Sequence, residues 1–225
     1  MKTILTFLFA LAFSLISWAQ TKDVSGRKIN PYNFHITGMD RFVSQKPQGS
    51  PYLNKAFSLA KVDDSENKFP VRYNAYSDEF EFLNSKNDTL VLDKSDAYSK
   101  IIFSGSNKKY LLTHYTDFTE KPYTGYLVEQ YQKNNWAVLK RERISFYPGK
   151  KAKTSLENDM PAKYNKEKED FYLKKPDGSI VEFPESKKQL GKLFPDKKDA
   201  IETFVKEQKI DFEYDQNKII DFLAQ

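Results

Sequence analysis

Hydrophobic and polar residues alternate along residues 49–149 in short runs that are separated by polar turns. The runs lie at 56–62, 69–82, 89–92, 100–103, 110–115, 126–132 and 136–147. Short strands at regular spacing, with Gly, Asn, Asp and Ser between them, are typical of an antiparallel sandwich or barrel. No segment with a helical period interrupts these runs, so the pattern predicts an antiparallel meander.

The stretch Phe69–Phe82 contains a break in this alternation. Val71, Tyr73 and Ala75 share one parity, whereas Phe80 and Phe82 have the other. A turn or bulge at 76–78 would return both apolar sets to one face. Polar and aromatic residues crowd the break and form our candidate binding site or structural joint: Arg72, Tyr73, Asn74, Tyr76, Asp78, Glu79 and Glu81. If the stretch is a joint, Arg72 should pair with the acidic residues around it.

The pattern changes after residue 149. Residues 150–168 are charged and contain Met160-Pro161, which predicts a linker or long loop. In 169–225, two short strands at 170–174 and 180–183 flank a Pro-Asp-Gly-Ser turn, followed by helical patterns at 186–193, 197–208 and 215–223. We therefore expect an α+β, mainly β fold: an antiparallel barrel or sandwich with a C-terminal β-hairpin and a small three-helix cap packed on the β domain.

The first residues have the features of a secretory signal. Met1-Lys2 precedes an apolar block at 4–16, and small residues precede position 20. This pattern predicts a signal peptide at 1–19 that is cleaved after Ala19, with an uncleaved membrane anchor as the alternative. The mature chain would then be periplasmic or extracellular and have no transmembrane segment. Residues 20–48 read as an irregular lead-in with one short strand at 34–36.

The composition narrows the chemistry further. The chain has no cysteine, which excludes disulfides, thiolate metal sites and lipid attachment through a cysteine. An exported chain without disulfides fits a bacterial periplasm or exterior. Aromatic residues make up 15% and charged residues 30%, which suits aromatic-rich strands with solvated opposite faces. The net charge of +5 comes from interspersed charges, so we expect no nucleic-acid partner.

Motifs for common catalytic chemistry are missing from the sequence. His35 and His114 are its two histidines, and neither accompanies a Gly-x-Ser-x-Gly nucleophile motif or a metal-ligand spacing. Glycine-rich phosphate-binding motifs and calcium-loop patterns do not occur either. We therefore expect no cofactor, no metal and no catalytic residue, although Asp78, Glu79 and Glu81 could supply a carboxylate pair.

These observations favour a non-enzymatic exported protein that acts by binding or as a component of the cell envelope. Its partner would be an envelope protein, a glycan or a small apolar ligand. Two alternatives stay open. One is a small β-barrel that holds an apolar ligand, and the other is a secreted hydrolase that depends on carboxylates.

Three sequence blocks resemble a family of uncharacterised secreted proteins of Gram-negative bacteria. The blocks are Gly49-Ser-Pro-Tyr-Leu-Asn54 followed by Phe57 and Val62, then Arg72-Tyr-Asn-Ala-Tyr-Ser-Asp-Glu79, then Leu193-Phe-Pro-Asp-Lys197 with the terminal helices. The resemblance covers most of the mature chain. It implies export and a β-rich architecture, and it implies no activity, ligand or catalytic residue.

Overall fold

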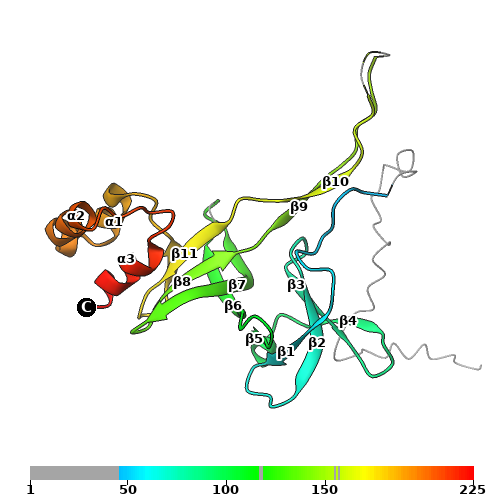
Figure 1. The fold of residues 1–225 in the computed structure, drawn as a ribbon, viewed down its shortest axis with the longest axis horizontal. Coiled ribbons are helices and arrows are strands. Elements are labelled where there is room, and N and C mark those ends of the chain that lie inside the picture. Colours follow the sequence, from blue (N-terminus) through cyan, green and yellow to red (C-terminus); the bar gives the residue numbers. More distant parts are fainter. Residues whose placement is uncertain (1–45, 117–118, 155, 157) are drawn as a thin grey trace, which may run out of the picture.

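The computed structural model describes residues 46–116, 119–154, 156 and 158–225, and its main feature is one ten-stranded antiparallel sheet (Figure 1). The strand order is β12-β11-β8-β7-β6-β5-β1-β2-β3-β4. The strands are β1 (Ser58–Val62), β2 (Lys68–Asn74), β3 (Glu79–Leu83), β4 (Thr89–Val91), β5 (Lys100–Phe103), β6 (Lys109–Thr116), β7 (Pro122–Lys133), β8 (Trp136–Arg141), β11 (Asp170–Lys174) and β12 (Ile180–Glu182). The predicted signal peptide at 1–19, the predicted strand at 34–36 and His35 lie outside the described residues.

A separate two-stranded sheet, β9 (Ile144–Tyr147) with β10 (Lys163–Lys166), forms an arm that projects from the main sheet (Figure 1). The single strand predicted at 136–147 is thus two strands, because β8 ends before the buried Glu142 and β9 leaves the main sheet. The segment 150–168, predicted as a linker or long loop, contains β10 and a bridge between Lys150 and Met160, so it is the returning half of this arm.

Three helices follow the β11–β12 hairpin: α1 (Lys187–Leu193), α2 (Lys198–Glu207) and α3 (Gln216–Leu223). Two 3-10 turns are also present, η1 (Asp96–Tyr98) and η2 (Pro195–Lys197). The Ser186 hydroxyl accepts a hydrogen bond from the Gln189 amide and caps α1, as its position before the helical pattern predicts. Leu190, Ile201 and Ile220 are fully buried in one apolar cluster that also includes residues of β8 and β11, so burial of apolar surface stabilises helices that are too short to be stable alone.

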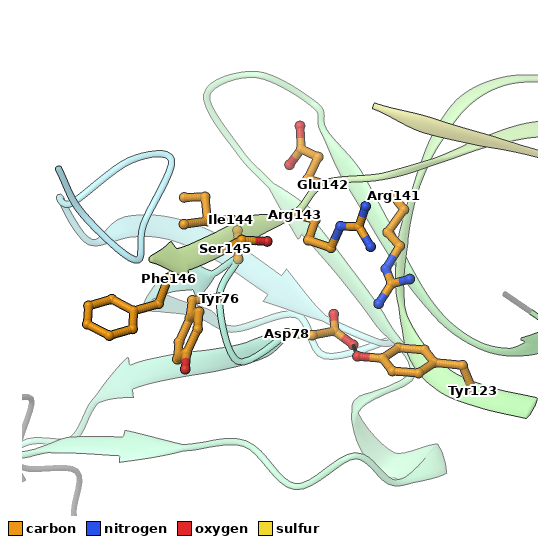
Figure 2. A pocket seen from close by; sticks show the side chains of 10 residues that line it. Tyr76, Asp78, Tyr123, Arg141, Glu142, Arg143, Ile144, Ser145 and Phe146 are labelled. Atoms are coloured by element: carbon orange, nitrogen blue, oxygen red, sulfur yellow. Dashed lines mark hydrogen bonds between the residues drawn. The ribbon is translucent and has the colours of Figure 1, made fainter. Parts of the chain in front are cut away.

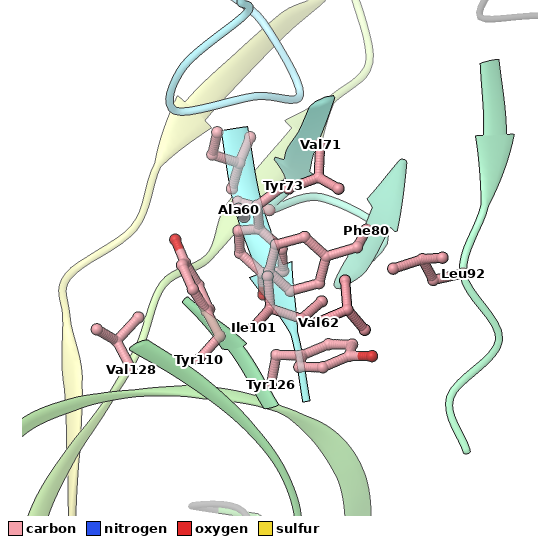
Figure 3. Close-up of a cluster of buried hydrophobic side chains, with 12 residues drawn as sticks. Ala60, Val62, Val71, Tyr73, Phe80, Leu92, Ile101, Tyr110, Tyr126 and Val128 are labelled. Atoms are coloured by element: carbon pink, nitrogen blue, oxygen red, sulfur yellow. The ribbon is translucent and has the colours of Figure 1, made fainter. Parts of the chain in front are cut away.

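The sheet has apolar clusters on both faces. In the half built from β1–β3 and β5–β7, one face carries a core rich in aromatic rings, including Tyr73, Phe80, Tyr110 and Tyr126 (Figure 3). The helices cover a second cluster around Val138 on β8. A third cluster, which includes Leu127, Leu139 and Tyr172, lies on the opposite face of β7, β8 and β11. Strand β7 therefore contributes alternate residues to two cores.

The structure confirms the mainly β fold with a large antiparallel sheet, a C-terminal hairpin and three helices. The sheet is not closed as a barrel, because its edge strands β4 and β12 lie at opposite ends of the strand order and do not pair. The hairpin continues the main sheet, since β11 pairs with β8. Among the described residues, no helix is both long enough and apolar enough to cross a membrane.

Candidate functional site

The candidate stretch forms the hairpin of β2 and β3 around a turn at 75–78. Asn74 lies opposite Glu79 at the end of the ladder, and Asp78 adopts a positive φ of 56°, a conformation that aspartate tolerates better than most residues. The turn corrects the phase as expected, because Val71, Tyr73, Ala75 and Phe80 all enter the same core. The polar residues of the stretch divide between the two faces of this hairpin.

Arg72 and Glu81 form the centre of the first polar group. Glu81 is fully buried and lies opposite Arg72 on the neighbouring strand. The Arg72 Nε donates to Glu81 Oε2 at 2.7 Å, and the Tyr52 hydroxyl and the Asn74 side-chain amide also donate to this carboxylate. The guanidinium lies between the rings of Tyr52 and Phe57, at 4.1 and 4.4 Å from their centroids. The expected pairing of Arg72 is present, and the network holds the segment before β1 against the sheet.

Asp78 is the centre of the second polar group, on the other face of the hairpin. Its Oδ1 accepts hydrogen bonds from the Tyr73 hydroxyl at 2.6 Å and from the Tyr126 amide at 3.1 Å. Its Oδ2 accepts from the Lys94 ammonium at 2.7 Å and from the Tyr123 hydroxyl at 3.2 Å. Each carboxylate oxygen therefore has two donors, and this aspartate joins the hairpin turn to β7 and to the chain after β4.

Gly125 on β7 makes the approach of Asp78 to the sheet feasible. A Cβ atom at this position would overlap both the Asp78 carboxylate and the Tyr123 ring. Burial, followed by the charge of Asp78, raises the pKa of Tyr73 well above its usual value, and the same two causes raise the pKa of Tyr123. Both phenols thus stay protonated and act as donors at neutral pH.

A third buried carboxylate, Glu142, lies in the bend between β8 and β9. It accepts hydrogen bonds from the Lys108 ammonium at 2.7 and 2.8 Å and from the Tyr110 hydroxyl at 2.7 Å. The Lys140 ammonium lies 3.6 Å from it. Burial and the Glu142 charge raise the pKa of Tyr110 far above its usual value. Glu142 therefore resembles Asp78 in being paired with a lysine and a buried tyrosine.

A cavity of about 300 Å³ lies between the Asp78 turn and the bend from β8 to β9 (Figure 2). Its lining residues are Ala75, Tyr76, Asp78, Tyr123, Arg141, Glu142, Arg143, Ile144, Ser145 and Phe146. Figure 2 shows the guanidinium groups of Arg141 and Arg143 on the side of the cavity where Asp78 and Tyr123 meet, and the rings of Tyr76 and Phe146 at its other end. The cavity thus has a cationic end and an aromatic end.

Arg141 contributes an unbalanced positive charge to this cavity. Its guanidinium lies over the Tyr123 ring, 4.4 Å from the ring centroid. Within the described ranges, it forms no ion pair with a carboxylate, although it is half-buried. Burial lowers its pKa, but the oxygens of Tyr115, Tyr123 and Tyr172 outweigh this effect and raise the pKa. Arg141 is therefore a cation that lies among tyrosines.

Arg143 is the second cation of the cavity, and its charge is partly balanced. Its terminal nitrogen lies 3.6 Å from Asp170, a long contact, and its Nε is buried without a hydrogen-bond partner. Burial raises the pKa of Asp170, whereas Arg143 and Arg141 lower it. The Asp78 and Glu142 charges of the same cavity are matched by Lys94 and Lys108, so the cavity keeps an excess of positive charge.

This arrangement is suited to holding an anion. Arginine presents a planar fork of donors that matches carboxylates and phosphates. The two buried carboxylates are fully engaged with donors, which does not suit them to serve as an acid and a base. In the part of the chain that the structure describes, no three His, Asp or Glu residues are grouped as metal ligands. His114 is also described, and its Nδ1 forms a hydrogen bond with the Thr124 hydroxyl.

The seven predicted residues do not form one site in the structure. Tyr76 and Asp78 line the cavity, and Tyr73 supports Asp78 from the core. Arg72, Asn74 and Glu81 form the network on the other face of the hairpin, and Glu79 belongs to neither hydrogen-bonded group. The stretch is therefore a joint for most of its residues and a cavity wall for two of them.

Sequence reasoning missed Tyr123, Arg141, Glu142 and Arg143. A signal for them existed, because Lys140 to Arg143 are four consecutive charged residues inside a predicted strand that is otherwise apolar on one face. Gly125 inside a strand was a second signal, since an internal glycine often marks a close approach by another group. Neither signal identifies Asp78 as the group that approaches.

Comparison with known proteins gives no relative from which a function could be transferred. No family model matches the chain, and no curated protein or solved structure matches it significantly.

Proposed function

We propose that this protein is an exported, non-enzymatic binding protein that holds a small anion in the cavity beside Arg141. The observation that carries this proposal is the half-buried Arg141, which faces the cavity without a carboxylate partner in the described chain. Its guanidinium is positioned by contact with the Tyr123 ring, so a ligand would meet a preformed cation. Export enters the proposal through the predicted signal peptide at 1–19, and the resemblance to secreted proteins of Gram-negative bacteria is consistent with it.

The ligand class follows from the charges and the size of the cavity. A volume of about 300 Å³ lies at the lower end of the range of small-molecule sites. Carboxylates and phosphates share the geometry that arginine recognises, and the Tyr76 and Phe146 rings offer an apolar surface at the other end. An acidic sugar of an envelope glycan satisfies this description, as does an aromatic acid.

The hydrolase alternative has less support from the same geometry. Hydrolysis by a carboxylate pair needs one carboxyl group that gives up a proton and one that is free to attack or to accept a proton. Asp78 and Glu142 each accept hydrogen bonds from a lysine and a tyrosine, so their oxygens are already used. The apolar-ligand barrel also has less support, because the sheet is not closed and aromatic rings fill the core on β1–β3 and β5–β7.

Calorimetric titration with acetate, benzoate, glucuronate and inorganic phosphate tests the proposal. At least one of these anions should bind with one site per chain. Replacement Arg141→Gln should weaken binding by about 10- to 150-fold, because a hydrogen bond to a charged group contributes about 1.5–3 kcal/mol. Lys86→Gln is the matched control, since it removes the same charge from an exposed position away from the cavity.

Two results would reject the proposal. One is that none of the four anions binds at millimolar concentrations. The other is that Arg141→Gln and Lys86→Gln weaken binding equally, which would indicate attraction by the overall charge. The relative affinities of the carboxylates and phosphate identify which class of anion the site prefers.

A further inference from the structure

A second cavity, of about 350 Å³, opens on the other side of the aromatic core. It lies between the segment before β1, strand β2 and the turn that joins β5 to β6, and its lining includes Leu53, Phe103, Gly105 and Tyr110. Tyr73 and Tyr110 separate it from the first cavity. Their rings contribute to its wall, whereas their hydroxyls bond to Asp78 and Glu142 in the first cavity.

The charged groups around this second cavity are already engaged with the protein. Arg72 is bound to Glu81 and to the Tyr52 hydroxyl, and the Lys108 ammonium donates to both oxygens of Glu142. A charged ligand would have to break one of these pairs and leave a buried carboxylate without its cation, which is strongly unfavourable.

Several uncharged polar atoms of the lining are engaged as well. The Tyr73 and Tyr110 hydroxyls donate to carboxylates. The side-chain oxygen of Asn54 accepts from the Ala56 amide, and the Ser106 hydroxyl oxygen accepts from the Lys108 amide. The Asn54 side-chain amide and the Ser58 and Ser106 hydroxyls can still donate hydrogen bonds, whereas the larger part of the surface left for contact is apolar.

We propose that the second cavity binds a small, neutral, apolar molecule. Leu53 is 39% exposed and Phe103 is half-buried, so a ligand in the cavity would remove apolar surface of both from water. The volume of the cavity lies within the range of small-molecule sites. The two cavities share no lining residue, so the sites can be tested separately.

The neutral dye N-phenyl-1-naphthylamine is a suitable probe, because its fluorescence rises in an apolar environment and it carries no charge. Titration of the full-length mature protein should give a saturable rise with one dye per chain. Gly105 offers a clean way to fill the cavity, since a Cβ there meets no atom within 4 Å and its φ is not positive. Gly105→Leu should weaken dye binding by at least about tenfold with little effect on folding.

Three further variants make the test decisive. Ala56→Phe adds a bulky side chain at another lining position, in the segment before β1, and should have the same effect as Gly105→Leu. Tyr214→Ser removes an apolar side chain that is 76% exposed in the helical region, and it should leave dye binding unchanged. Arg141→Gln should also leave dye binding unchanged, so failure of the anion site and failure of this site are distinguishable.

Thermal unfolding of each variant establishes that it is folded before dye binding is compared. The inference is overturned if folded Gly105→Leu and Ala56→Phe bind the dye as tightly as the unmodified protein. It is also overturned if the dye signal does not saturate, or if Tyr214→Ser lowers it as much as the cavity variants do, because the dye would then report general apolar surface.

Discussion

Replacing Arg72 tests whether the hairpin of β2 and β3 is a structural joint. Glu81 is completely buried, and its Oε2 lies 2.7 Å from Nε and 2.6 Å from Nη2 of Arg72. In Arg72→Met the aliphatic part of the side chain remains, but a buried carboxylate loses its cation. Breaking a buried ion pair in this way costs about 3–5 kcal/mol. The remaining donors, Tyr52 and Asn74, already bind Glu81 and cannot replace the lost charge.

The assay is urea denaturation followed by far-ultraviolet circular dichroism at neutral pH. A loss of about 3–5 kcal/mol corresponds to a fall in melting temperature of roughly 6–20 °C for a chain of this size. In the double variant, Glu81→Gln is added to Arg72→Met and removes the buried negative charge that Arg72→Met leaves without a partner. The double variant should therefore be more stable than Arg72→Met alone, or at least no less stable.

Lys86→Ala is the control, and as an exposed cation it should change the free energy of unfolding by less than about 0.5 kcal/mol. The reasoning is refuted if Arg72→Met loses less than about 1 kcal/mol, since that would mean that Glu81 has no need of its partner. It is also refuted if the losses of the two single variants simply add in the double variant.

Three other predictions follow from the same contacts. Gly125→Ala should destabilise the protein by about 1–3 kcal/mol in urea denaturation, because the added methyl group displaces Asp78 and Tyr123. The same displacement should weaken anion binding. Unchanged stability would contradict the close approach of Asp78 to Gly125. The raised pKa values of Tyr73 and Tyr110 favour their neutral forms in the folded state, so these two residues should leave stability unchanged up to about pH 10 and lower it above that pH by about 2.7 kcal/mol per pH unit. Other tyrosines with a raised pKa, such as Tyr52 and Tyr126, add to this fall, and titration of every tyrosine near pH 10 in the folded protein would contradict the prediction. Mass spectrometry of the exported protein should find Gln20 at its N-terminus, whereas a chain that keeps residues 1–19 would contradict the predicted cleavage.

The elements of the fold follow closely from the sequence, because their patterns are local. Alternation predicts β5 and β11, and a capping serine with an apolar stripe predicts α1. The path of the chain after Arg141 does not follow, because it depends on contacts of Glu142 with Lys108 and Tyr110, more than 30 residues away. Alternation alone also cannot decide whether a meander closes into a barrel.

The candidate site was predicted in part for the same reason. The phase break at 76–78 indicates a turn, and the pairing of Arg72 with an acidic residue is expected from neighbouring strands. The cavity, however, is assembled from the turn, β7 and the bend after β8, which are distant in sequence. Tyr76 and Asp78 could therefore be selected in advance, whereas the arginines that give the cavity its charge could not.

The most direct test of anion binding uses the side-chain nitrogen signals of arginine. The chain has five arginines, Arg27, Arg41, Arg72, Arg141 and Arg143, so ¹⁵N-labelled arginine gives a small set of Nε signals that single substitutions can assign. Titration with the anion that binds most tightly should move the Arg141 signal most, with a smaller shift for Arg143 and none for Arg72. Equal shifts of all five signals, or no shift of Arg141 at a saturating concentration, would contradict the proposed site.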